Sequence, residues 1–195
     1  AASMSVLEII AVLISVLGVT LTIKRHIACW VVNFIACLLY AYLFFEYQLY
    51  GETVLQTLFM GMAVYGFFQW KTAQQQKQHI VIQSLPLYKM WLQIALSSIL
   101  GLLFGLSLKW RTQAALPLWD AQLAAMSLLA TYWTSRKYLA TWVLWIVVDL
   151  VYIGMFIYKE LLLTAVLYAG FVVLAYLGWR EWHKIRQQHA AHSAL

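Results

Sequence analysis

The stretch that decides the fold runs from residue 139 to 158 and reads LATWVLWIVVDLVYIGMFIY. It holds no lysine or arginine and a single acid, Asp149. A helix needs about 20 mostly apolar residues to cross the hydrocarbon core of a bilayer. We therefore predict that this stretch is a transmembrane helix.

Six further apolar stretches of similar length surround it, so the sequence predicts an all-α membrane protein with seven transmembrane helices. The connections between them are short, except for a polar loop at 71–88, and a polar tail follows at 183–195. The other six spans are predicted at 5–23, 27–46, 52–70, 89–108, 117–135 and 161–180.

The composition supports a single membrane-embedded domain whose outer surface meets the lipid bilayer. Of the 195 residues, 64% are hydrophobic and 10% charged, and the mean hydropathy is +0.77. Soluble domains carry about 25% charged residues. The net charge of +6 does not indicate a nucleic-acid partner, because the basic residues stand in small groups between apolar runs.

Motifs for catalysis and metal binding are missing from the sequence. There is no P-loop, no nucleophile elbow and no His/Cys spacing typical of a metal site. The two cysteines, Cys29 and Cys37, lie in one apolar stretch and indicate no disulfide framework. We therefore expect no enzyme activity, no cofactor and no metal.

The basic residues predict the orientation of the chain. If the N-terminus is outside, the inner segments hold ten of the 13 Lys and Arg residues, and the outer segments hold Lys109, Arg111 and Lys159. Lys and Arg accumulate on the cytoplasmic side of membrane proteins. This predicts an external N-terminus, a cytoplasmic loop at 71–88 and a cytoplasmic C-terminal tail.

The second half of the sequence repeats the first. Residues 5–70 align with 117–182 without a gap, and 16 of the 66 positions are identical. Apolar helices match one another easily, whereas matched Trp, Tyr and Gly are harder to obtain by chance. The informative pairs are Trp30 with Trp142, Tyr40 with Tyr152, Phe44 with Phe156, Phe59 with Phe171, Gly66 with Gly178 and Trp70 with Trp182.

Three spans, a linker helix at 89–108 and three more spans form a 3+1+3 arrangement. Because three is odd, the linker helix gives both halves the same orientation, and the two parallel repeats are then related by an axis along the membrane normal. The linker carries Gly101 and Gly105 in a GxxxG motif. We interpret this motif as a site of close packing on a neighbouring helix.

The repeated positions follow a 3,4,3,4 spacing, which places them on one face of each helix. Such polar and aromatic faces usually line the interior of a helix bundle. We expect the faces of the two repeats to point at each other. They comprise Trp30, Asn33, Cys37, Tyr40 and Phe44; Gln56, Phe59, Ala63, Gly66 and Trp70; Trp142, Trp145, Asp149, Tyr152 and Phe156; and Tyr168, Phe171, Ala175, Gly178 and Trp182.

Asp149 is the most informative single residue, because it stands ten residues into its span and thus near the bilayer midplane. A carboxylate at that depth costs on the order of 3 kcal/mol, so it should face water, a partner or a ligand. A structural hydrogen bond between helices is the alternative. No Lys or Arg stands at matching depth in any span.

The remaining candidates for ligand contact are aromatic or neutral polar residues. Asn33 and Gln56 are suited to orient a polar ligand by hydrogen bonds. Trp142 and Trp182 stand at cytoplasmic helix ends, where an interfacial aromatic belt is an equal explanation. The deeper candidates are Tyr40, Phe59, Trp145, Tyr152 and Tyr168.

On these motifs the chain resembles the PnuC family of bacterial vitamin transporters over essentially its whole length. The resemblance depends on the two three-helix units around a linker, on Trp142-xx-Trp145-xxx-Asp149 and on Gly178-xxx-Trp182. It implies a bacterial inner-membrane protein with an architecture similar to that of the SWEET sugar transporters. It also implies uptake of nicotinamide riboside by facilitated diffusion, trapping by phosphorylation inside the cell, and a homo-oligomer, with a trimer as the suggested form.

The choice of vitamin and of function class stays open at this point. Nicotinamide riboside is a cation, so an aromatic cage and one carboxylate would suit it. Thiamine is also a cation, whereas neutral riboflavin would give Asp149 no charge to balance. A membrane enzyme would need a reactive constellation that is missing, and a purely structural protein would leave Asp149 without a role.

Overall fold

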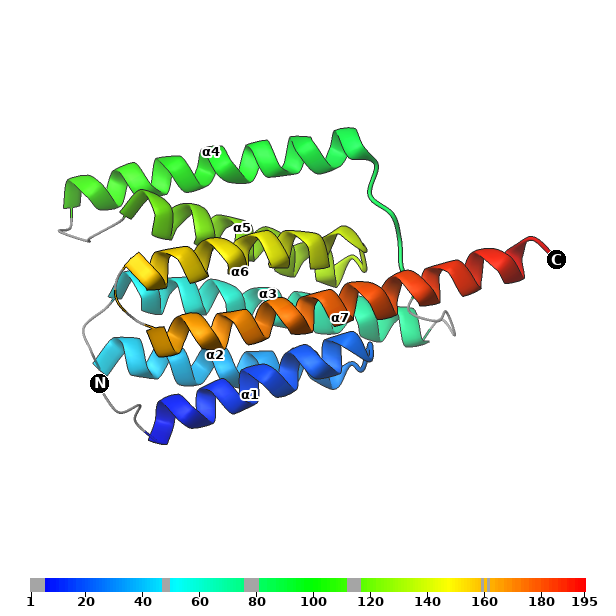
Figure 1. Cartoon of the computed structure of the whole chain (residues 1–195), viewed down its shortest axis with the longest axis horizontal. Coiled ribbons are helices and arrows are strands. Elements are labelled where there is room, and N and C mark those ends of the chain that lie inside the picture. Colours follow the sequence, from blue (N-terminus) through cyan, green and yellow to red (C-terminus); the bar gives the residue numbers. More distant parts are fainter. Residues whose placement is uncertain (1–5, 47–49, 76–80, 112–116, 159, 161) are drawn as a thin grey trace. The chain divides into compact units, whose positions relative to one another are not determined.

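The structure is a computed structural model that describes residues 6–46, 50–75, 81–111, 117–158, 160 and 162–195. The all-α prediction is confirmed, because the described part of the chain forms seven helices (Figure 1). They are α1 (Val6–Ile23), α2 (Ala28–Glu46), α3 (Tyr50–Gln75), α4 (Leu87–Arg111), α5 (Pro117–Ser135), α6 (Ala140–Tyr158) and α7 (Leu162–Ser193).

Five of these helices, α1, α2, α4, α6 and α7, are long and apolar enough to cross a membrane. The helices α3 and α5 fall outside this group. The chain divides into two compact units, which we describe separately: residues 1–81 with α1–α3, and residues 82–195 with α4–α7.

The helix boundaries agree closely with the predicted spans at most ends. Two helices continue further than predicted: α3 runs on to Gln75 and α7 to Ser193. Beyond Gly178 the sequence holds neither glycine nor proline, so nothing interrupts the helix. Most of the predicted tail at 183–195 is therefore helical.

In the first unit, α2 is the central helix and packs against both α1 and α3. The contact with α1 is close at Gly18, which is buried under the side-chain oxygen of Asn33. The face of α1 that meets α2 also includes the fully buried Ala11. Small residues on α1 thus let the two helix backbones approach each other.

In the second unit, α5 packs between α4 and α6, and α7 packs on α6. The GxxxG motif lies in the interface between α4 and α5, which run side by side (Figure 1). A Cβ atom added to Gly101 would lie 2.9 Å from the Cβ of Ala125, and one added to Gly105 would lie 3.1 Å from the Cβ of Ala121. The predicted packing role of this motif is confirmed.

The turn between α1 and α2 and the turn between α5 and α6 are built alike. Arg25 has a φ of 56°, and Lys137, its counterpart in the alignment of the two halves, has a φ of 63°. Such left-handed backbone is uncommon for residues other than glycine. Five backbone hydrogen bonds around Arg25 recur at the equivalent positions around Lys137. Written from the N–H donor to the carbonyl acceptor, they are 24 to 20, 25 to 22, 26 to 21, 29 to 26 and 30 to 27 in the first turn, and 136 to 132, 137 to 134, 138 to 133, 141 to 138 and 142 to 139 in the second.

A buried polar pair next to each turn follows the same correspondence. Thr22 is hydrogen-bonded to Cys29 in the first unit. In the second unit the hydroxyl oxygens of Thr134 and Thr141 lie 2.9 Å apart. Thr22 also donates to the carbonyl of residue 18 over 2.8 Å, as Thr134 donates to residue 130 over 2.9 Å. Thr22 and Thr134 therefore have hydrogen-bond partners both within their own helix and across the turn.

The turn between α5 and α6 carries an additional strap. The backbone N–H of Gln83 donates to the carbonyl of Lys137 over 2.8 Å, and the N–H of Leu139 donates to the carbonyl of Gln83 over 3.0 Å. Ile82, next to this bridge, is buried. Burial and the neighbouring Arg136 lower the pKa of Lys137. The segment that leads into α4 is therefore fixed to the α5–α6 turn.

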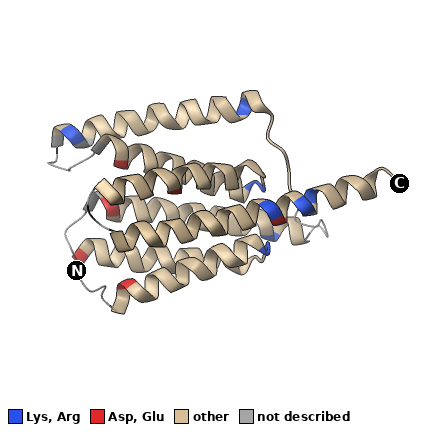
Figure 2. Ribbon diagram, in the orientation of Figure 1, with Lys and Arg blue, Asp and Glu red and all other residues tan. Residues whose placement is uncertain are grey.

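Lysine and arginine gather mainly at one end of the helices of each unit (Figure 2). In the first unit this is the end where α1 and α3 finish, with Lys24, Arg25 and Lys71. In the second unit it is the end where α4 begins and α5 finishes. Lys77 and Lys159, which the orientation count also used, lie outside the described residues.

Candidate functional site

A tryptophan pair joins α6 to α7 in the second unit. The ring centroids of Trp142 and Trp182 lie 5.3 Å apart with an interplanar angle of 88°, an edge-to-face contact. The indole of Trp142 covers Gly178, where an added Cβ would lie 2.6 Å from the ring. Both rings are almost fully buried. Because Gly178 has no Cβ, the indole of Trp142 can lie directly against the α7 backbone.

The first unit holds the same arrangement between α2 and α3. Trp30 and Trp70 meet edge to face, with centroids 5.4 Å apart and an interplanar angle of 87°. Trp30 covers Gly66, where an added Cβ would lie 2.5 Å from the ring. Within the described chain, the buried indole N–H groups of Trp30 and Trp142 have no hydrogen-bond partner. Each unit therefore offers an unused donor at an equivalent position.

Asp149 lies in the middle of α6 and is 6% exposed. Among the residues that the structure describes, none donates a hydrogen bond to its carboxylate or forms an ion pair with it. A hydrogen bond that ties helices together was the alternative role, and the described contacts do not supply one. A buried carboxylate without a partner is unfavourable unless a ligand or water balances it.

An aromatic cluster begins one turn after Asp149. Tyr152 and Phe156 stack with centroids 5.8 Å apart, and Tyr168 of α7 lies 5.0 Å from each of them. Phe171 adds an edge-to-face contact with Tyr168 at 5.5 Å. Four rings from two helices thus form one cluster next to the turn that carries the carboxylate. Phe156 and Phe171 share the predicted faces, and the repeat pairs would have justified their inclusion among the site residues.

Trp145 packs against the core between α5 and α6, whereas Trp142 meets Trp182 of α7. Tyr152 contacts the same core and also reaches Tyr168. That core consists of Leu123, Leu129, Ala130, Trp133, Leu144 and Val148.

In the first unit the candidate residues are divided between two helices. Asn33 contacts Gly18 of α1, and the hydroxyl of Tyr40 is hydrogen-bonded to Ser15 of α1. Tyr40 also stacks on Phe44, with centroids 6.1 Å apart, as Tyr152 stacks on Phe156. Gln56 and Phe59 stand on α3, where both are half-buried. Asn33 and Tyr40 thus lie toward α1, whereas Trp30 lies toward α3.

The polar groups of these faces can bind a ligand. The described residues contain no group of three or more His, Cys, Asp or Glu side chains that could hold a metal ion. A single buried acid beside several rings can balance the charge of a cationic aromatic molecule.

The buried Thr134–Thr141 pair was not predicted from the sequence, although the matched Thr22 and Thr134 pointed to it.

Long apolar helices with a buried carboxylate among aromatic rings define a helical membrane protein with the features of a small-molecule transporter. The chain belongs to the nicotinamide mononucleotide transporter family, whose sequence model matches residues 5–184. The resemblance to PnuC proteins is therefore confirmed.

The similar proteins are described as transporters of nicotinamide riboside. The nicotinamide riboside transporter PnuC of Escherichia coli is 24% identical over 205 residues, which cover 92% of this chain and 85% of that protein. The protein of the same name from Neisseria mucosa is 25% identical over 187 residues, covering 88% and 71%. A crystal structure of the vitamin B3 transporter PnuC matches with a TM-score of 0.68 and 25% identity, covering 92% of this chain and 81% of that chain.

Proposed function

We propose that this protein carries nicotinamide riboside across the bacterial inner membrane by facilitated diffusion. Family membership and the substrate named for its relatives support this proposal. The observation that carries it is Asp149, a buried carboxylate without a partner among the described residues, one helix turn from an aromatic cluster.

The substrate's chemistry fits this face. Nicotinamide riboside has a fixed pyridinium charge, a carboxamide and ribose hydroxyls. The Asp149 carboxylate would balance the ring charge, and each well-placed aromatic ring would add about 0.5–2 kcal/mol. The indole N–H of Trp142 and the side chains of Asn33 and Gln56 would serve the amide and the sugar as hydrogen-bond partners.

The residues that we assign to the substrate come from both halves of the sequence. We propose that the two halves are parallel repeats, as in parallel-repeat transporters. The contacts that recur at equivalent positions of the two units support this repeat. The residues that we assign to the substrate are Asn33, Tyr40, Gln56, Phe59, Trp142, Trp145, Asp149, Tyr152, Tyr168 and Trp182.

The proposed energetics are those of a uniporter. Proton-driven carriers place chains of ionisable residues within their spans. The spans of this chain hold Asp149 as the one acid at midplane depth. Substrate would then equilibrate down its own gradient, and phosphorylation in the cytoplasm would retain it. The concentration of basic residues at one helix end in each unit supports an external N-terminus and a cytoplasmic C-terminus.

Thiamine is the second candidate substrate, because Asp149 would balance any cationic aromatic ring. Riboflavin follows as a third, since it suits the aromatic residues but carries no charge for the carboxylate. The substrate named for the relatives favours nicotinamide riboside. Binding of all three molecules by the purified protein would rank them.

The test is binding by purified Asp149→Asn, which keeps the shape of the side chain and removes its charge. Loss of a charge-assisted contact to a fixed cation should lower the affinity roughly tenfold to a hundredfold. Asp120→Asn, which removes a carboxylate in the first turn of α5, is the matched control and should bind like the parent. Unchanged affinity of Asp149→Asn for all three molecules would exclude Asp149 from the site.

A further inference from the structure

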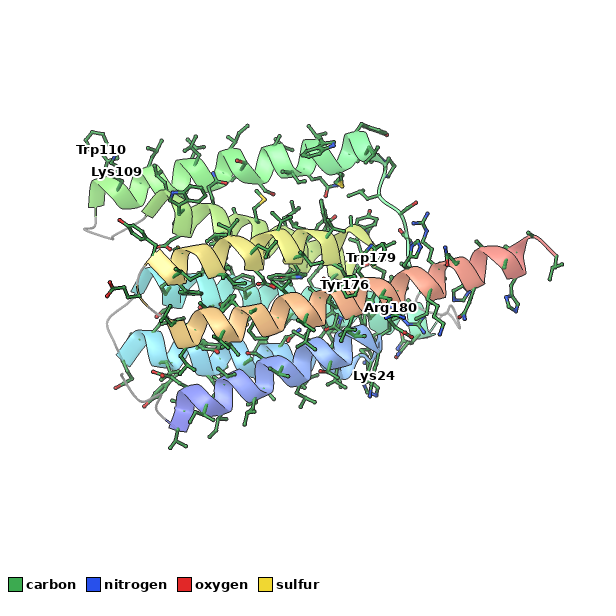
Figure 3. The ribbon with its side chains drawn as sticks, in the orientation of Figure 1. Lys24, Lys109, Trp110, Tyr176, Trp179 and Arg180 are labelled. Atoms are coloured by element: carbon green, nitrogen blue, oxygen red, sulfur yellow. The ribbon has the colours of Figure 1, made fainter. Side chains whose placement is uncertain are left out.

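A ladder of three rings lies on α7 toward its C-terminal part. The rings of Tyr176 and Trp179 stack with centroids 6.4 Å apart, and His183 lies nearly parallel to Trp179 at 5.0 Å. Tyr176 is 52% exposed, and the other two are partly exposed. Figure 3 shows Tyr176, Trp179 and Arg180 one after another along this helix. The ladder therefore offers exposed aromatic surface beside a cation.

Two cations stand next to the ladder. Arg180 and Lys184 are exposed, and neither makes an ion pair or hydrogen bond with the described residues. Their spacing of four residues puts them on one side of the helix. Glu181, the nearest acid along the chain, stands about 80° around the helix from the mean direction of the two. The pair is thus a positive site that no group in the described chain neutralises.

An exposed apolar stripe of α7 leads directly to these cations. Its members, Leu162, Val166, Val173 and Leu177, are 44–68% exposed. At about 100° per residue, Arg180 and Lys184 point within about 30° of the mean direction of this stripe. Tyr176, the ladder residue nearest to the stripe, points about 70° away from the mean direction of the stripe. A molecule that lies along the stripe therefore meets hydrocarbon first and then positive charge, with the ring of Tyr176 to one side.

We propose that this surface of α7 binds an anionic phospholipid. Its acyl chains lie along Val166, Val173 and Leu177, and its phosphate lies between Arg180 and Lys184. Tyr and Trp are favoured at the level of lipid headgroups, and basic residues just beyond a membrane helix attract anionic lipids. The proposal rests on the membrane embedding of α7 and not on the substrate, so it can fail or hold independently of the transport assignment.

The test compares lipids bound to the full-length protein. The protein is equilibrated with phosphatidylglycerol and phosphatidylcholine of identical chains, and the retained lipids are quantified by native mass spectrometry. We expect the parent to prefer phosphatidylglycerol and Arg180→Gln/Lys184→Gln to lose roughly tenfold to thirtyfold of that preference. The charge-preserving Arg180→Lys/Lys184→Arg should retain it.

The matched control is Lys24→Gln/Lys71→Gln, which removes two charges from the basic end of the first unit. It should keep the preference of the parent, and all variants should show the same helicity by circular dichroism. If both double glutamine variants lost the phosphatidylglycerol preference equally, the effect would be one of general charge and the proposed site would be wrong. If Arg180→Gln/Lys184→Gln retained the preference, the proposed site would also be wrong. Equal protection of lipid-depleted protein by inorganic phosphate would also overturn it, because the hydrocarbon stripe would then contribute nothing.

Discussion

Replacing Gly178 by alanine is the sharpest test of the tryptophan pair in the second unit. A Cβ at this position would lie 2.6–2.7 Å from three ring atoms of Trp142. Carbon atoms pack at about 3.5–4.0 Å, so the indole would have to retreat by about 1 Å. Trp142 is 3% exposed and is held edge-on by Trp182, which leaves little room for that movement.

Two opposing effects set the change in unfolding free energy on Gly178→Ala. Overpacking of a buried side chain costs about 1–3 kcal/mol, whereas alanine in place of glycine favours a helix by about 1 kcal/mol. Gly170 stands on the same helix, and a Cβ there would meet nothing within 4 Å. The difference in unfolding free energy between Gly178→Ala and Gly170→Ala cancels the helix preference. We therefore expect Gly178→Ala to be less stable than Gly170→Ala by about 1–3 kcal/mol.

Reversible unfolding in mixed detergent micelles would measure this difference, and nicotinamide riboside binding would be recorded on the same samples. In the first unit, Gly66→Ala should differ from Gly61→Ala in the same direction, because Gly66 lies under Trp30 and Gly61 has open space. If Trp142 contacts substrate, Gly178→Ala should also weaken binding. Equal stability of Gly178→Ala and Gly170→Ala would refute the close packing of the Trp142 indole on Gly178.

Four other predictions concern separate features. Tyr168→Ala should remove the α7 ring that contacts both Tyr152 and Phe156 and lower substrate affinity roughly tenfold or more, measured by calorimetry against Tyr158→Ala. Nicotinamide mononucleotide should compete poorly in liposome uptake, since Asp149 repels its phosphate; competition equal to that of the riboside would contradict this. Gly101→Leu should destabilise the α4–α5 contact by about 1–3 kcal/mol in the same unfolding assay. Lys137→Gly should exceed Lys137→Ala in stability by about 1–2 kcal/mol, because only glycine relieves the positive φ; equal stability would argue against that strain.

Much of the fold could be predicted from the sequence because the bilayer imposes one strong rule. A span must be helical, apolar and about 20 residues long. Most ends of the seven helices could therefore be predicted from the apolar stretches, although α3 and α5 fall outside the group that is apolar enough to cross a membrane. The extensions of α3 and α7 could not be predicted in this way. Residues 71–75 of α3 and most of residues 183–193 of α7 are polar. Hydropathy does not distinguish a polar helix from a polar loop.

The candidate site was predictable as a set of residues and less so as a geometry. The ungapped alignment of the two halves predicted which tryptophans and glycines correspond, and Trp30 on Gly66 and Trp142 on Gly178 are packed alike. The depth of Asp149 predicted a carboxylate that needs a partner. Its lack of one among the described residues could not be known without coordinates, since a hydrogen bond between helices was also compatible with the sequence.

By itself, the sequence determined that the chain is a helical membrane protein and which residues share a helix face. It also singled out Asp149 as a charged residue in the middle of a predicted span. Only the tertiary structure decided which neighbour each side chain meets. Asn33 and Tyr40 lie toward α1, whereas Trp30 lies toward α3, and Trp145 packs toward α5 while Trp142 meets α7. The reason is that α2 and α6 each pack between two helices. A spacing of three and four residues defines one broad face, but the side chains at its two edges point to different neighbours.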